Sequence, residues 1–186
     1  MQKIIFTAHC LLNTASKVVL YNQQEIDAEE KLRRTFIHQA IDNDIQLIQL
    51  PCPEFTLYGA KRWGHVSSQF DNVFFRSHCR KLLVPIIEQL KEYLSNNERF
   101  EVLGFIGIDG SPSCGVDYTC YGDWYGAFDG REDLSQTLAS CHLDKGPGVF
   151  IAVLKEMLEE EHLEDQIIIR SLFAPEPDKC LELLNE

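Results

Sequence analysis

The chain has 186 residues, a length that is typical of one domain. Its 29 acidic and 17 basic side chains give a formal net charge of −12, which argues against DNA binding and other binding that depends on positive charge. Hydrophobic residues make up 45% of the chain, too many for a disordered protein, and the apolar runs are too short to span a membrane.

The first half of the chain alternates apolar strands with helical patterns. A short β-branched run at 3–8 predicts a buried strand, and apolar residues at helical spacing predict a helix over about 27–42. A second strand is expected at 45–50, followed by a helical stretch over about 70–96. Within that stretch, Pro85 predicts either a kink or the start of another helix.

The second half continues the alternation around one long irregular segment. A third strand is expected at 101–108, and an amphipathic helix opens at Val149. Between them, about 115–148 shows no long period but is rich in aromatic residues, which favours an ordered lid. A fourth strand is predicted at 167–172 and a short final helix at 177–184.

Strands that alternate with helices indicate βαβ units. We therefore expect a single α/β domain over 1–186, with a Rossmann-like open and mostly parallel sheet of about four strands, helices on both faces, and a lid over about 115–148.

The seven cysteines form an odd set in a chain whose first residues lack the features of a signal peptide. A disulfide framework is therefore not expected, and reduced thiols in the cytoplasm are the default. Such thiols serve as core residues, nucleophiles or metal ligands.

Three of the cysteines follow three predicted strands: Cys10, Cys52 and Cys114. Ligands of open parallel sheets bind at the carboxyl ends of the strands, so these thiols are expected at one edge. Taken alone, each is better explained as a buried core residue than as a ligand. Together they indicate a metal ion or a cluster, because three thiolates without a cation would repel one another. Three ligands also leave one coordination position open, as in catalytic sites.

Polar residues next to these cysteines are candidates for chemistry. Glu54 is a candidate general acid or base, or else a solvated loop carboxylate. Ser111 and Ser113 either hold an anion or simply form the turn before Cys114. Asn13 and Ser113 are candidate substrate contacts.

The lid adds aromatic candidates for substrate binding. Tyr118 and Tyr121, with Trp124 and Tyr125, either stack on a heterocycle or pack the lid onto the domain.

The other four cysteines do not follow predicted strands. Cys120 and Cys141 lie in the lid, where they either approach the site or pack the lid. Cys79 and Cys180 lie inside predicted helices and are expected to fill space there.

Four motifs together resemble the TudS-like desulfidases, the relatives of thiouracil desulfidase. They are HCLLN at 9–13, PCPE at 51–54, GSPSCG at 110–115 and KGPGVF at 145–150. The chain departs from the family pattern after CPE, where it reads FTLYGAKRWG instead of a Gly-Gly-Leu stretch followed by Pro-Arg, and at Asn13, where Gly is usual. These differences indicate a divergent branch with a changed pocket wall.

The resemblance implies an oxygen-sensitive [4Fe-4S] cluster with one iron that no protein residue ligates. The implied ligands are Cys10, Cys52 and Cys114, with Glu54 as the proton-transfer residue and Ser111 as its partner. The free iron would take the sulfur of a thiolated substrate, and water would replace that sulfur without any electron donor.

The predicted function is therefore hydrolytic removal of sulfur, as hydrosulfide, from a small thiolated molecule such as a thiouracil-like heterocycle. Two alternatives stay open: a cluster-bearing sulfur carrier without hydrolytic activity, and a zinc or small-molecule binding module. The negative charge does not favour RNA as the substrate. The sequence leaves a homodimer open.

Overall fold

The computed structural model describes residues 1–185, and its centre is a four-stranded parallel sheet. The strand order is β2-β1-β3-β6, and all three pairs are parallel. The strands are β1 (Gln2–Thr7), β2 (Gln46–Gln49), β3 (Phe100–Ile108) and β6 (Ile169–Leu172). The predicted α/β class and parallel sheet are confirmed, with each strand within two residues of its predicted bounds.

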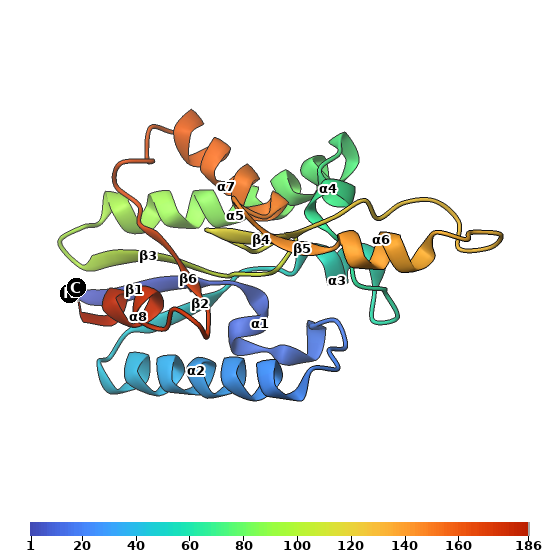
Figure 1. Ribbon diagram of the computed structural model, residues 1–186. Helices are drawn as coiled ribbons and strands as arrows, with labels where there is room; N and C mark the ends of the chain where they lie inside the picture. Colours follow the sequence, from blue (N-terminus) through green and yellow to red (C-terminus); the bar gives the residue numbers. More distant parts are fainter. Residues whose placement is uncertain (186) are drawn as a thin grey trace.

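Helices cover both faces of this sheet (Figure 1). One face carries α5 (Val73–Ser95) and α7 (Val149–Glu160). The other carries α2 (Gln23–Asp42), α8 (Asp178–Leu181) and the short 3-10 helix η2 (Glu182–Asn185). The helix α5 continues through Pro85, so no second helix begins there.

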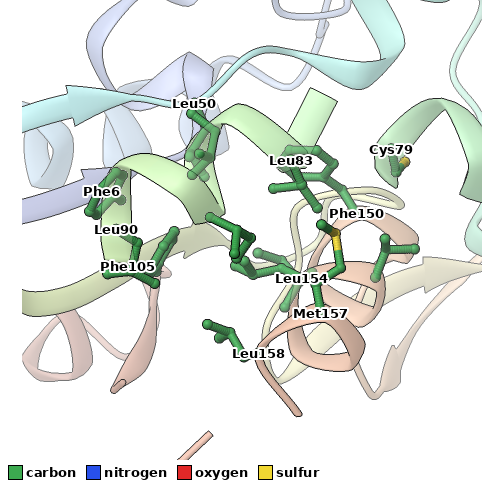
Figure 2. Close-up of a cluster of buried hydrophobic side chains, with 14 of the residues drawn as sticks. Phe6, Leu50, Cys79, Leu83, Leu90, Phe105, Phe150, Leu154, Met157 and Leu158 are labelled. Atoms are coloured by element: carbon green, nitrogen blue, oxygen red, sulfur yellow. The ribbon is translucent and has the colours of Figure 1, made fainter. Parts of the chain in front are cut away.

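Each face of the sheet has its own buried apolar cluster. Figure 2 shows the larger one, where side chains of β1 and β3 meet those of α5 and α7. Within it, Phe6 and Phe105 stack with ring centroids 4.7 Å apart, and both are fully buried. On the opposite face, Phe36 of α2 is fully buried beside residues of α8.

Truncation of the buried stack is expected to destabilise the fold strongly. The variant Phe105→Ala should lower the free energy of unfolding by about 3–5 kcal/mol, because the lost transfer energy adds to a cavity that close-packed neighbours cannot fill. Urea denaturation measures this change. The matched control is Phe74→Ala on α5, where the ring is 83% exposed, with an expected change within about 0.5 kcal/mol. Equal effects of the two substitutions would contradict this packing.

Short helices lie between the predicted elements. They are α1 (His9–Leu12) after β1, the 3-10 helix η1 (Thr14–Ser16), α3 (Pro53–Tyr58) after β2, and α4 (Ser67–Phe70). In addition, α2 begins four residues before its predicted start, because the side chain of Asn22 caps the N–H of Glu25 at 3.5 Å. These short helices determine where the functional side chains lie.

The predicted lid segment, 115–148, is ordered and has regular structure of its own. The strands β4 (Tyr118–Tyr121) and β5 (His142–Lys145) form a two-stranded antiparallel sheet, and α6 (Leu134–Ser140) precedes β5. This small sheet lies beside the parallel sheet on the α5 and α7 side (Figure 1). None of the helices within residues 1–185 is long and apolar enough to cross a membrane.

Candidate functional site

The three cysteines singled out by the sequence lie at the carboxyl edge of the parallel sheet. Cys10 lies in α1, just after β1, and Cys52 caps α3, just after β2. Cys114 lies in the turn that follows β3. Because β2, β1 and β3 are neighbours in that order, their three connections leave the sheet side by side. The strand order reverses between β1 and β3, and this is the point where open α/β sheets bind ligands.

The thiols of Cys10 and Cys52 influence each other's ionisation. The Cys10 thiol lowers the pKa of Cys52 to about 7, and the Phe55 N–H, 3.3 Å from the Cys52 Sγ, lowers it further. The Cys52 thiol in turn raises the pKa of Cys10, as do its burial and the nearby charge of Cys114. Cys52 is therefore the thiol of this pair that ionises first.

The third thiol belongs to the same electrostatic group. Burial raises the pKa of Cys114, and the charges of Glu54 and Cys52 raise it further. Ser113 Oγ lies 3.5 Å from Cys114 Sγ. Within residues 1–185, no three His, Cys, Asp or Glu side chains are grouped so that they could hold one metal ion. The charge of Cys52 raises the pKa of both Cys10 and Cys114, and the charge of Cys114 raises that of Cys10, so the three soft donors lie close enough for their thiolates to interact.

Glu54 is a buried carboxylate next to these thiols, held from both sides. It is the second residue of α3, and 8% of its surface is exposed. Its Oε1 accepts a hydrogen bond of 2.6 Å from Ser113 Oγ, and its Oε2 accepts one of 3.1 Å from Arg62 Nε. Arg62 also donates to the carbonyls of Ser16 at 2.7 Å and Gly59 at 3.3 Å. The guanidinium thus ties three segments together and fixes the carboxylate.

The two serines of the turn have different contacts from those expected. Ser113, not Ser111, is the direct hydrogen-bond partner of Glu54. Ser111 Oγ lies 3.3 Å from Ser113 Oγ and accepts the Cys114 N–H at 3.0 Å. A continuous path therefore leads from Ser111 through Ser113 to the Glu54 carboxylate, with Ser111 one step away from it.

The turn that carries these residues is held by a buried aspartate and by the start of α7. Oδ1 of Asp109 accepts three backbone N–H groups, those of residues 116, 117 and 118, at 2.8 to 3.3 Å. The first N–H groups of α7 donate to the carbonyls of Pro112 and Ser113 at 2.9 to 3.2 Å. At Gly148, a Cβ atom would lie 2.5 Å from the Ser113 carbonyl carbon. Only glycine permits this approach of helix and turn.

The variant Gly148→Ala is expected to disturb the site without touching its chemical groups. The added methyl group must push away the backbone of Ser113, which lengthens the Ser113–Glu54 hydrogen bond. We expect a loss of stability of about 1–3 kcal/mol from overpacking, measured by urea denaturation, together with reduced activity. The control is Gly64→Ala, where nothing lies within 4 Å of the added Cβ. Wild-type behaviour of both variants would contradict the close approach at Gly148.

The other predicted substrate contacts have protein partners of their own. The Oδ1 of Asn13 accepts the Ala15 N–H at 3.0 Å and so caps η1. Tyr118 donates from its hydroxyl to Glu176 at 3.3 Å, in the C-terminal part of the chain. Tyr121 is half exposed and packs edge-on against His142 of β5. These three side chains make local contacts in this structure, and their role in binding the substrate stays a prediction.

The remaining cysteines separate into two kinds. Cys79 and Cys180 are fully buried in the two apolar clusters, as predicted. Burial raises the pKa of Cys79 to about 12, and the charge of Glu54 also raises it. Cys120 and Cys141 lie in the small sheet region, where the charge of Cys141 adds to burial in raising the pKa of Cys120.

Sequence reasoning missed three residues that organise the site: Arg62, Asp109 and Gly148. The sequence showed Arg62 only as part of a basic pair, and nothing local indicated that its side chain is 3% exposed. The Asp-Gly pair at 109–110 indicated a turn but not the capping of three N–H groups. The Gly-Pro-Gly run at 146–148 indicated a helix start, without showing which backbone approaches it.

Comparison with known proteins gives one family and one curated relative. The family model described as "Putative 2-thiouracil desulfurase" matches residues 2–126. An uncharacterized protein of Methanocaldococcus jannaschii, MJ0003, is 32% identical over 115 residues, which cover 62% of this chain and 69% of that protein. No solved structure matches. The matched range of the family model contains the three cysteines, Glu54 and both serines of the turn.

Proposed function

The chain belongs to the family described as "Putative 2-thiouracil desulfurase", and on this premise we propose that it is a hydrolytic desulfidase. In the proposed reaction, water replaces the sulfur of a C=S group in a small thiolated heterocycle, and the sulfur leaves as hydrosulfide. The carbon keeps its oxidation state, so no electron donor is needed. The observation that carries the proposal is a buried carboxylate, fixed by hydrogen bonds, beside three thiols at the switch point of the sheet.

Glu54 is the proposed proton-transfer residue. Arg62 holds Oε2, so the carboxylate keeps one orientation, and Oε1 already accepts a hydrogen bond from Ser113. A carboxylate in this position takes a proton from the attacking water. Ser113 and Ser111, whose hydroxyl oxygens are 3.3 Å apart, continue the path along which the proton leaves or returns.

Cys10, Cys52 and Cys114 are the proposed ligands of a [4Fe-4S] cluster. The donor set fits such a group, because three soft thiolates favour iron–sulfur chemistry and need a cation to offset their mutual repulsion. A cluster takes one thiolate per iron, so its ligands need not converge on a single ion as the ligands of zinc do. When bound, the cluster would supply an iron without a protein ligand, a Lewis acid that a soft thiocarbonyl sulfur prefers to water.

The cellular setting that suits these thiols is a reducing one. All seven cysteines are free in the structure. We propose that the protein works in the cytoplasm, where thiols stay reduced.

Sulfide release tests the proposed function. Protein prepared without oxygen is incubated with 2-thiouracil, and both hydrosulfide and uracil are measured over time. We expect equal amounts of the two products over many turnovers. Sulfur that stays on the protein, with at most one equivalent removed and no further turnover, would instead support a sulfur carrier. Absence of both products for thiolated pyrimidines and other thioamides would contradict the proposal.

A further inference from the structure

Two cysteines of the lid segment, Cys120 and Cys141, take no part in the proposed chemistry. Cys120 lies in β4, and Cys141 ends α6 and directly precedes β5. Both thiols are free and partly exposed, whereas Cys79 and Cys180 are fully buried in the apolar clusters. A dissolved reagent can therefore reach the two thiols of the lid.

The register of the small sheet brings these two thiols to one face. The strands β4 and β5 are antiparallel, with Cys120 opposite Leu143 and Tyr121 opposite His142. Side chains two residues apart along a strand point to the same side, so Cys141 continues the face on which Leu143 meets Cys120. Burial raises the pKa of Cys120, and the charge of Cys141 raises it further, as expected of thiols close enough to interact.

Gly122 leaves room for the Cys141 side chain between the two strands. The same register, continued by one residue, places Gly122 opposite Cys141. A Cβ atom at Gly122 would lie 3.1 Å from both Cα and Sγ of Cys141. The sulfur of Cys141 therefore lies toward β4, and a side chain at position 122 would push it away.

A bond between the two sulfurs needs only a small approach of the backbones. Cα atoms of diagonal neighbours in an antiparallel pair lie about 7–8 Å apart, and disulfides join Cα atoms roughly 4.4–6.8 Å apart, so an approach of about 1 Å suffices. Cys141 lies beyond the last pair of the ladder, and its backbone N–H donates to the Leu138 carbonyl of α6 at 3.2 Å. It can therefore shift without breaking the pairing of β4 with β5.

A bridge at this place would close the irregular part of the lid at its base. Residues 122–133 link β4 to α6 without regular structure, and Figure 1 shows them extending away from the parallel sheet. At the base, the Asp123 N–H donates to Ser140 Oγ at 3.0 Å. The strand β4 is also joined to the turn of the candidate site, because Thr119 Oγ1 donates to the Ser111 carbonyl at 3.1 Å. The bridge would thus restrain the loop next to that turn.

We propose that Cys120 and Cys141 are a reversible modification site, at which oxidised glutathione or another small disulfide converts the two thiols into a disulfide that restrains residues 122–133. The proposal does not depend on the proposed function, because both cysteines lie outside the candidate site. In a reducing cytoplasm such a disulfide is transient and follows the redox state of the surroundings.

The exchange proceeds in two balanced steps. The thiolate of one cysteine attacks a sulfur of oxidised glutathione, the bond between the two glutathione sulfurs breaks, and a mixed disulfide and one glutathione are left. The second cysteine then attacks the protein sulfur of the mixed disulfide and releases the other glutathione. Two protein thiols are oxidised to one disulfide, and their two electrons and two protons are taken up by the two glutathione thiols.

Digestion with trypsin tests the proposal, because Arg131 is the one lysine or arginine between the two cysteines. Protein prepared without oxygen is treated with oxidised glutathione, digested in the folded state, alkylated and separated in denaturant. We expect the fragments on either side of Arg131 to stay joined until a reductant is added, with the linkage placed between Cys120 and Cys141 by mass spectrometry. Cleavage at Arg131 should be about tenfold slower than in reduced protein, since the closed loop opens less often.

Three results would overturn the proposal. They are thiols that stay free in excess oxidised glutathione, separate glutathione adducts on Cys120 and Cys141, and a linkage of Cys141 to another cysteine. An unchanged cleavage rate in the joined form would overturn the restraint of the loop. The variants Cys120→Ser and Cys141→Ser should each abolish the joined fragments, whereas Cys180→Ala, at a buried position in the other apolar cluster, should keep them.

A glycine variant tests the geometry without removing either thiol. Gly122→Ala places a methyl group against Cys141 and is expected to slow formation of the disulfide several-fold, because the sulfur is pushed away from β4. The control is Gly64→Ala, where nothing lies within 4 Å of the added Cβ and the rate should not change. The time course of joined fragments gives both rates. Equal rates for the two variants would contradict the placement of the Cys141 sulfur.

Discussion

Replacement of Glu54 by glutamine is expected to lower kcat/KM for sulfide release by about 10²- to 10⁴-fold, the range that a positioned acid or base contributes. Glutamine keeps the length of the side chain and can still accept from Ser113, but its amide cannot take a proton from water. The initial rate of hydrosulfide formation measures the effect.

Two further variants distinguish a loss of catalysis from a loss of folding. The Glu54–Arg62 pair is buried, so its loss also costs stability, which urea denaturation of Glu54→Gln records. The variant Glu54→Asp keeps the charge but shortens the reach, and it should lose most of the activity with a smaller loss of stability. The carboxylate control is Glu88→Gln on α5, at an exposed position, with activity unchanged. Full activity of a folded Glu54→Gln would remove the carboxylate from the mechanism.

The second large effect is expected at the three strand-end cysteines. Each of Cys10→Ser, Cys52→Ser and Cys114→Ser should lose most of the iron and essentially all activity after anaerobic preparation, whereas the wild type should hold about four irons and four sulfides per chain. Removing a residue that hydrogen-bonds to a metal ligand typically lowers metal affinity or activity by about 10- to 100-fold, and removing the ligand itself should lower them more. Iron and acid-labile sulfide analysis gives the direct measurement.

Cys180→Ala is the matched control for these variants. Cys180 is also fully buried, but it lies in the apolar cluster on the other face of the sheet. Its replacement should lower stability modestly and leave the iron content unchanged. If all four variants lose iron alike, or if the wild type takes up zinc without sulfide, the assignment of the three ligands is wrong.

The sequence predicted the sheet well, because its signal is local. The apolar runs at 3–8 and 45–50 are short, β-branched or continuous, and bounded by polar residues, so the buried strands could be placed within two residues. The topology of the sheet, and not a local spacing motif, then brings the three cysteines together. Once the strands are parallel, Cys10, Cys52 and Cys114 must leave the sheet at the same edge.

Other features depend on contacts that no local pattern contains. The spacing in the motif could not decide which of Ser111 and Ser113 meets Glu54, because the conformation of the turn determines where each hydroxyl points. Arg62 reaches the buried carboxylate and Ser16 only through the packing of three separate segments. The rings of Trp63 and Phe128 likewise come to 6.0 Å from each other across a long stretch of chain, and helical or strand periodicity does not report such pairs.

The measurement that tests the central claim most directly is the reaction of 2-thiouracil in ¹⁸O-labelled water, without any electron donor. A hydrolytic desulfidase must place one labelled oxygen in the uracil product for each hydrosulfide released, and it must do so repeatedly. Mass spectrometry of the product, together with sulfide determination, follows both. Labelled uracil and hydrosulfide in equal amounts are the predicted result. Unlabelled product, or sulfide release that requires an added reductant, would contradict the account.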